Sequence, residues 1–147
     1  MSAGSSPALD LDALVAQLTA LEEDGARRRF IAENRSLWNA AVVQELSNRV
    51  RQLVRSDTGS ALRLAAAAVA ISEFLGDKLA LAQSLRSQAN ALYAIDQHGA
   101  AVEFHERAIA LFQEIGNFGE LARTLSGSIQ PFLLLGQYDR ALAAADR

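Results

Sequence analysis

The fold of this chain is decided by residues 79–117, which read LALAQSLRSQANALYAIDQHGAAVEFHERAIALFQEIGN. Apolar residues recur at intervals of three and four in both halves of this stretch, which is the period of an amphipathic helix. The pattern predicts helices over residues 79–95 and 100–115. The polar tetrapeptide at 96–99 supplies the turn between them. We therefore expect one helical hairpin.

The landmarks of this hairpin recur in both directions along the chain. Ala61, Ala101 and Ala141 are spaced 40 residues apart, and the sequence Leu75-Gly76-Asp77 returns as Ile115-Gly116-Asn117. Self-similarity at a fixed period is the signature of stacked structural repeats. The same apolar pattern predicts the other helices, at residues 9–22, 26–34, 41–55, 60–75, 121–135 and 140–147.

The composition favours an all-α protein. Half of the 147 residues are apolar, only 6% are aromatic, and two are prolines. Alanine and leucine lose little side-chain entropy in a helix, so helices rich in them form readily and pack closely. A chain of this length can bury its core as one domain. Because it has no cysteine, disulfides and thiolate metal sites are excluded.

Three features of the N-terminal part carry local predictions. Gly25 is expected to end the first helix. The basic run Arg27–Arg29 follows the acidic run Glu22–Asp24, which is typical of a solvated helix face. Trp38 is the only tryptophan, and we expect its large ring to staple the N-terminal helices to the helices that follow.

Charge and motif content argue against several classes of function. A net charge of −3 and a pI near 5.4 provide no basic field for nucleic acid. No signal peptide is recognisable, and no uninterrupted apolar run approaches the roughly 18 residues of a membrane span, so we expect a cytoplasmic protein without membrane contact. His98 is expected in a turn and His105 in partly buried packing, with no carboxylate cluster to complete a metal shell. No phosphate loop or activated nucleophile is recognisable, so no enzyme activity, metal or cofactor is expected.

The repeat resembles the tetratricopeptide repeat (TPR) family, in a long form of about 40 residues. The resemblance covers residues 41–147. The positions that carry it fall on the family's packing positions: Leu85, Ala89, Leu92, Ala101 and Ala108. It implies a right-handed solenoid of antiparallel helical hairpins with about seven to eight helices.

This chain also departs from the TPR pattern. His105 stands where the family usually has an aromatic residue, and Ile129 and Pro131 are unusual in the third unit. Glu45 and Arg49 stand at packing positions of the first unit, which makes that unit degenerate. The implied organisation is a disordered N-terminus at 1–8, capping helices at 9–40, and repeats at 41–77 (degenerate), 78–117 (the best unit) and 118–147 (truncated).

A looser resemblance concerns the phrase ALFQEIGN at residues 110–117. It is similar to the N-terminal TPR segments of large bacterial proteins that carry a downstream signalling or caspase-like (CHAT) domain. Because residue 147 falls about two turns into the last expected helix, the chain is expected to be a fragment of a longer bacterial regulator. Self-association through that truncated helix is a further expectation.

The TPR resemblance also implies a binding surface. TPR proteins usually bind extended peptides on their concave face, with residues from the first helix of each hairpin. The matching residues here are Arg86, Asn90, Tyr93, Arg123, Ser126, Gln130 and Leu133. Arg86 and Asn90 resemble part of the carboxylate clamp of chaperone-binding TPR domains, but Gly127 stands where a second clamp donor is expected.

The sequence leaves three alternatives open. The polar row on the concave face either binds a peptide or partner domain, or is only solvated. The whole stack either serves as a protein-interaction scaffold, or is a structural module that self-associates or packs on its own missing C-terminal domain. The N-terminal helices either cap the stack or fold into its groove.

Overall fold

The computed structural model describes residues 10–124 of the chain, and all of the regular secondary structure within that range is helical, as the composition and periodicity predict. The elements are α1 (Leu11–Ala20), α2 (Asp24–Glu33), the 3-10 helix η1 (Arg35–Leu37), α3 (Ala40–Leu53), α4 (Thr58–Leu75), α5 (Lys78–Ala94) and α6 (His98–Ile115). A further helix begins at residue 118 and continues to the end of the described part. The expected helix at 140–147 and most of that at 121–135 lie outside the described residues.

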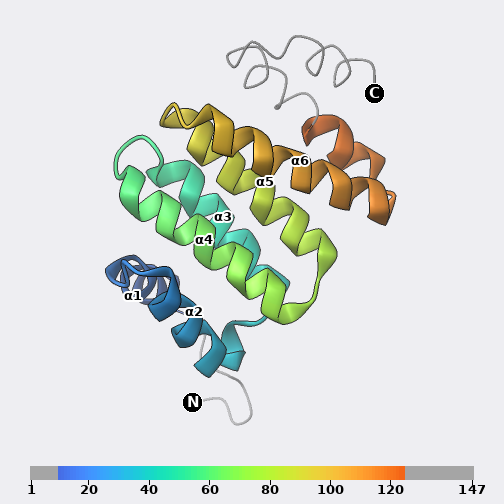
Figure 1. Cartoon of the computed structure of the whole chain (residues 1–147). Helices are drawn as coiled ribbons and strands as arrows, with labels where there is room; N and C mark the ends of the chain where they lie inside the picture. The colour runs from blue at the N-terminus through green and yellow to red at the C-terminus, as the bar shows by residue number, and fades with distance from the viewer. Residues whose placement is uncertain (1–9, 125–147) are drawn as a thin grey trace.

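The longer helices pack as two hairpins (Figure 1). Helix α3 packs against α4, α5 packs against α6, and α5 also contacts both helices of the first hairpin. The N-terminal helices α1 and α2 both lie against α4. They therefore cover the first hairpin on its α4 side and leave the side where α3 meets α5 uncovered.

The 40-residue repeat is visible in the helix ends. Helices α4 and α6 both end in a glycine in the left-handed conformation, Gly76 with φ 72° and Gly116 with φ 81°. A side chain at that φ is strained, so glycine is the residue that stops a helix there. The next helix starts directly with a cap, because the side chains of Asp77 and Asn117 each accept the amide three residues on.

Gly25 does not end the first helix. Helix α1 ends earlier, where Leu21 takes an extended conformation, and Gly25 lies in the first turn of α2. The basic run that follows also differs from the prediction, since Arg27 is buried and bonds to Asp24 and to a backbone carbonyl before the helix. Arg28 forms an ion pair with Glu73 of α4. Two arginines of this run therefore hold α2 against the segment before it and against α4, instead of only facing solvent.

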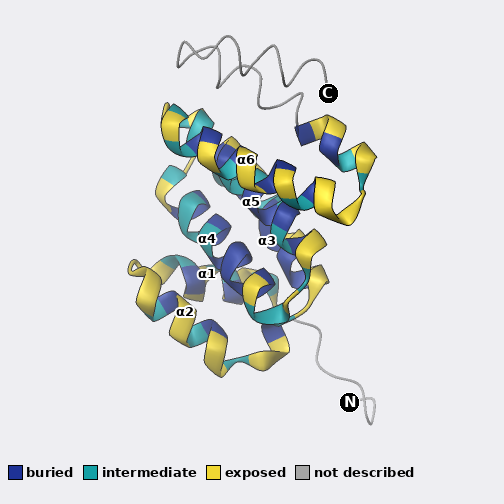
Figure 2. Cartoon of the chain, turned by 45° about the vertical axis from the view of Figure 1, so that its right-hand side comes forward, coloured by how far each residue is buried: buried dark blue, intermediate teal, exposed yellow. Residues whose placement is uncertain are grey.

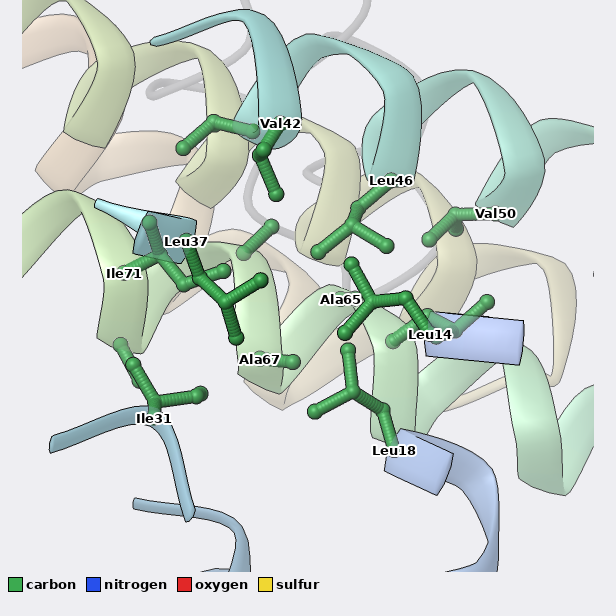
Figure 3. Close-up of a cluster of buried hydrophobic side chains, with 14 of the residues drawn as sticks. Leu14, Leu18, Ile31, Leu37, Val42, Leu46, Val50, Ala65, Ala67 and Ile71 are labelled. Atoms are coloured by element: carbon green, nitrogen blue, oxygen red, sulfur yellow. The ribbon is translucent and has the colours of Figure 1, made fainter. Parts of the chain in front are cut away.

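The buried side chains form two clusters. The larger one joins the N-terminal helices to the α3–α4 hairpin, and Figure 3 shows Leu14 and Leu18 of α1 meeting Leu46 of α3 and Ala65 of α4. The smaller cluster lies in the α5–α6 hairpin around Leu85 and Phe112. Figure 2 shows that the buried faces point inward between the helices and the exposed faces point outward.

Helix α4 is the central element of the larger cluster. It has ten buried residues, and five of them are alanine. In the described part of the chain it is the one helix whose length and hydropathy would suffice to cross a membrane, and half of it is buried inside the protein. A core helix surrounded by α1, α2, α3 and α5 has that same composition, because small apolar residues allow all four neighbours to approach.

The buried positions of α3 and of α5 are 39 residues apart, one fewer than the 40-residue repeat predicts. Leu46 and Val50 are buried, and they lie 39 residues before the buried Leu85 and Ala89. Glu45, at the 40-residue spacing, is exposed. The acidic residue therefore does not occupy a packing position, and α3 presents a normal apolar face.

Arg49, the other polar residue assigned to a packing position, is half-buried. Its guanidinium forms an ion pair of 2.9 Å with the exposed Asp12 of α1. It therefore links α3 to the N-terminal helices at the rim of the core.

Ile115 is an exposed apolar residue at the end of α6. The apolar periodicity of this helix predicts an inward face of Ala101, Ala108, Ile109, Phe112 and Ile115; the first four are buried, but Ile115 is 40% exposed. It lies at the end of α6 beside the start of α5, where Lys78 and Glu114 form an ion pair.

Trp38 joins the N-terminal helices to the end of α4, as its size predicts. Its ring stacks on Phe74 with centroids 5.1 Å apart and planes 13° from parallel. Its indole N–H donates to the carbonyl of Ile31 at 2.9 Å. Guanidinium groups extend the stack on both sides, with Arg35 at 5.0 Å from the Trp38 ring and Arg28 at 5.6 Å from the Phe74 ring.

Trp38→Ala is expected to lower the free energy of unfolding by about 2–3 kcal/mol, since it removes a half-buried ring and its stack. Trp38→Phe keeps a ring against Phe74 and loses only the indole hydrogen bond, so its effect should be about 1 kcal/mol. The measurement is urea unfolding followed by circular dichroism, because the substitution removes the only tryptophan fluorophore. Equal effects of the two substitutions would show that the stack does not contribute.

Candidate binding groove between α3 and α5

A hollow of about 100 Å³ lies between α3 and α5. Helix α3 contributes four residues from successive turns of one face, Val54 directly after it contributes a fifth, and α5 contributes five that face them. The lining residues are Gln44, Ser47, Val50, Arg51, Val54, Gln83, Arg86, Ser87, Asn90 and Ala91. We refer to this hollow as the α3–α5 groove.

The α3–α5 groove is polar along its rim and lacks acidic residues. Its two charged side chains are Arg51 and Arg86, and its amides come from Gln44, Gln83 and Asn90. None of its ten lining residues is aspartate or glutamate, although the whole chain carries a net charge of −3. The groove is therefore locally positive on an acidic protein.

Arg86 is held in place by the next helix. Its guanidinium forms a 2.7 Å ion pair with Glu120 and donates to the hydroxyl of Thr124 at 3.4 Å. It also lies 5.4 Å from the centre of the Phe112 ring. Only 22% of the Arg86 side chain and 18% of the Glu120 side chain are exposed. Arg86 thus lines the groove and at the same time fastens α5 to the helix that begins at residue 118.

The start of that helix is capped from one side only. The Asn117 side chain accepts the amide of Glu120 at 3.1 Å, as the capping-box spacing predicts. The Glu120 carboxylate does not return to the amide of Asn117, which instead donates to the carbonyl of Phe112. The carboxylate pairs with Arg86 and Arg123 because two guanidinium groups attract it more strongly than one amide does.

A double-mutant cycle on Arg86→Met and Glu120→Gln is expected to give a coupling energy of about 1 kcal/mol or more, because this pair is mostly shielded from water. The cycle on Arg123→Met and Glu120→Gln should give less than about 0.5 kcal/mol, since the Arg123 side chain is 77% exposed. Both are measured by urea unfolding. Equal couplings would contradict a fastening role for Arg86.

The other residues taken from the concave-face pattern are spread more widely. Asn90 is exposed and lines the groove. Tyr93 is half-buried, and its ring lies 5.2 Å from that of His98, outside the groove lining. Arg123 is exposed and paired with Glu120. Ser126, Gln130 and Leu133 lie outside the described residues.

The α3 side of the groove was missed by reasoning from sequence. Helix α3 packs in a register of 39 residues. The positions 39 residues before Arg86, Asn90 and Tyr93 all line the groove: they are Ser47, Arg51 and Val54. The positions 40 residues before the same three are Leu46, Val50 and Leu53, of which only Val50 lines the groove. A one-residue slip turns a helix by about 100° and so selects a different face.

Two serine hydroxyls in the groove lack partners. Most of the described hydroxyls within helices donate to a carbonyl one turn earlier, as Ser72 and Ser84 do. Ser47 and Ser87 face each other's helices across the groove, and neither hydroxyl oxygen has a hydrogen-bond partner among the described residues. Ser47 is only 9% exposed. An unpaired buried hydroxyl costs free energy that a bound polar group can recover.

A larger hollow of about 220 Å³ lies on the other side of α4, between α2 and α6. Two of its three arginines pair with carboxylates that also line it, and Arg107 lies 5.5 Å from the ring of Phe104. Four of its five charged side chains are therefore paired within the protein. The α3–α5 groove is smaller but holds the unpaired groups, so it is the better candidate for binding.

The two histidines do not form a site together. His98 is the first residue of α6, not part of a turn, and its ring contacts Tyr93. His105 is 1% exposed, more deeply buried than expected, and neither ring nitrogen has a partner among the described residues. Burial, with a smaller contribution from the Arg86 charge, lowers the pKa of His105 to about 4. Residues 10–124 contain no group of three or more histidine or acidic residues arranged to hold a metal ion.

No family model matches the chain, and comparisons with curated proteins and with solved structures give no significant match.

Proposed function

We propose that this protein is a protein-interaction scaffold that holds a peptide or partner segment in the α3–α5 groove. The observation that carries the proposal is the groove itself, which residues 10–124 leave open, with hydroxyls unpaired within that range at its base and amide and guanidinium donors at its rim. The N-terminal helices lie on α4, so they do not occupy the groove.

The wider context of the proposal comes from the sequence. A TPR-like solenoid is built of paired helices, and here the glycines that end the second helix of each pair lie 40 residues apart. In such a solenoid the groove would lie on the concave face. We further propose a cytoplasmic role within a larger bacterial regulatory protein. A chain of this kind acts by holding its partner, and no chemical step is assigned to it.

Arg86 is a poor residue with which to test this proposal, because its loss also releases the helix at 118. Asn90 is a better choice, since it is exposed and its side chain is not held by an ion pair to another helix. Asn90→Trp places an indole across the groove. Ala94→Trp places the same ring on an exposed position one turn further along α5, outside the groove lining.

The expected result concerns peptides selected from a random library on the immobilised full chain. Their binding to the wild type, measured by fluorescence anisotropy, should weaken by about tenfold or more in Asn90→Trp and by less than about twofold in Ala94→Trp. Selected peptides that bind Asn90→Trp as tightly as the wild type would contradict the use of this groove. Failure of any peptide to be enriched would count against it as well.

A second candidate function is self-association, which one observation favours. Leu79, Ile115 and Phe118 are the exposed large apolar residues of the described part, and they lie where α5 begins and α6 ends. Phe118 is 74% exposed. If this edge joins two copies, sedimentation equilibrium should show dimers that Phe118→Ser converts to monomers. A wild-type monomer at high concentration would exclude this candidate. The expected C-terminal contact involves residues outside the described range.

A further inference from the structure

The side chains that line the groove indicate the chemistry of the segment that it binds, and the first of them is Arg51. This side chain lies in the last turn of α3 and lines the groove. Its guanidinium donates to the side-chain oxygen of Asn48, which also accepts from Gln44 at 3.2 Å. Asn48 thus holds Arg51 beside the groove, in a position fixed before any ligand arrives.

Arg51 has no carboxylate partner in the described part of the chain. Five of the eleven arginines in the described residues form ion pairs there, and Arg51 is one of the six that do not and the one of those six that lines the groove. A guanidinium has five N–H donors in a fork that fits a carboxylate with two parallel bonds. Only one of these donors is assigned, to Asn48. Arg51 is therefore a charged donor that lines a binding groove without its natural counterpart.

The base of the groove adds a second requirement. The hydroxyls of Ser47 on α3 and Ser87 on α5 are buried and unpaired among the described residues, and both serines line the groove. A hydroxyl can donate to a carbonyl or accept from an amide, and an extended peptide offers both groups at each residue. Apolar contact beside them comes mainly from the half-buried Val54, since Val50 and Ala91 are each only 2% exposed.

We propose that the α3–α5 groove selects an extended acidic peptide segment, with a carboxylate side chain on Arg51 and a small apolar side chain on Val54. This inference rests on the proposed function and names the chemistry of the segment. Its main chain bonds to the hydroxyls of Ser47 and Ser87. Because the groove lining contains no acidic residue, no charge there repels the carboxylate.

A nucleic acid fits the same groove less well. A single strand also carries negative charge, but its affinity depends on aromatic side chains on which bases stack. None of the ten residues that line the groove is aromatic. The groove is also short and carries only two arginines, one of which is already paired with Glu120. A carboxylate within a peptide matches one available guanidinium.

The test compares matched variants and matched peptides with the full chain. Short random peptides displayed on phage are selected on the wild-type protein, and the enriched sequences are synthesised with a fluorescent label. Binding is measured to Arg51→Gln and to Arg55→Gln, which removes the same charge from an exposed position outside the groove lining. Ser47→Ala and Ser56→Ala form a second pair, inside and outside the groove. Each peptide is also made with its Asp and Glu residues replaced by Asn and Gln.

The expected result is enrichment of acidic residues next to small apolar ones. Arg51→Gln and the neutralised peptides should each weaken binding by about tenfold, which corresponds to about 1.4 kcal/mol. Ser47→Ala should weaken it by about threefold or more, while Arg55→Gln and Ser56→Ala stay within about twofold of the wild type. Circular dichroism of each variant confirms that the helices are retained.

The other outcomes separate the inference from the function on which it rests. Two outcomes would overturn the inference that the segment is acidic and leave the groove in use. In one, the peptides bind Asn90→Trp weakly but carry no acidic residue; in the other, they bind Arg51→Gln as tightly as the wild type. Equal effects of Arg51→Gln and Arg55→Gln on peptide binding would show that only the overall charge of the protein attracts the peptide, and would overturn the inference. A labelled single-stranded oligonucleotide that binds more tightly than the peptides would overturn it too. Peptides unaffected by Asn90→Trp would contradict the proposed function itself.

Discussion

His105→Leu is expected to remove a loss of stability that the wild type shows as the pH falls from 6.5 toward 4. The His105 side chain is buried between α5 and α6, and its pKa is lowered from 6.5 to about 4. In the unfolded chain the same ring accepts its proton near pH 6.5. Acid therefore favours the unfolded state throughout this window, and the stability is fully present only above it.

The size of this effect follows from the two pKa values. Each pH unit between 6.5 and 4 should lower the free energy of unfolding by about 1.4 kcal/mol through His105 alone, or about 3 kcal/mol over the window. Leucine is similar in volume, cannot titrate and leaves no unpaired nitrogen. His105→Leu is therefore expected also to be at least as stable as the wild type at neutral pH.

The measurement is urea unfolding at a series of pH values for the wild type, His105→Leu and His98→Gln. The difference between the wild type and His105→Leu isolates the contribution of this one ring from that of the acidic residues, which titrate in all three proteins. Parallel losses of stability in the wild type and His105→Leu would contradict this role of the buried ring. So would a change of the pH profile in His98→Gln as large as that in His105→Leu.

Phe112→Ala is expected to lower the free energy of unfolding by about 3–5 kcal/mol, the range typical of deleting a fully buried aromatic ring. Phe112 is fully buried at the centre of the smaller cluster, and Arg86 lies over its ring. Its removal leaves a cavity and also withdraws the surface on which the Arg86 guanidinium rests. The second hairpin and the helix at 118 should be weakened together.

Phe118→Ala is the matched control for this prediction, because it deletes the same side chain from a position that is 74% exposed. Its effect should stay within about 0.5 kcal/mol. Thermal and urea unfolding of both variants provide the comparison. Similar losses in the two variants would show that the α5–α6 hairpin is not organised around Phe112.

The parts of the fold that the sequence predicts best are those that local chemistry determines. Gly76 and Gly116 end α4 and α6 where predicted, because only glycine adopts their left-handed conformation without strain. Asp77 caps α5 for a similarly local reason. Gly25 shows the limit of this reasoning, since a glycine with an ordinary conformation is tolerated in a first helical turn.

The groove was only half predictable from the sequence. The α5 side follows from the pattern of polar residues on the second hairpin. The α3 side depends on a register of 39 residues. This register is set by how Leu46 and Val50 pack, and not by the 40-residue spacing of the glycines that end α4 and α6. The pairing of Arg86 with Glu120 was likewise hidden, because it joins two helices that α6 separates in the sequence and whose relative position only the packing defines.

The central claim is that the α3–α5 groove is where this protein holds its partner, and mapping of backbone amide shifts tests it most directly. An isotope-labelled sample of the full chain is titrated with a peptide selected on the wild type. The predicted result is that the largest shift changes fall on Ser47, Arg51, Ser87 and Asn90, with small changes on the outer faces of α2 and α6. Changes centred on the α2–α6 side, or on the edge formed by Leu79, Ile115 and Phe118, would contradict the claim.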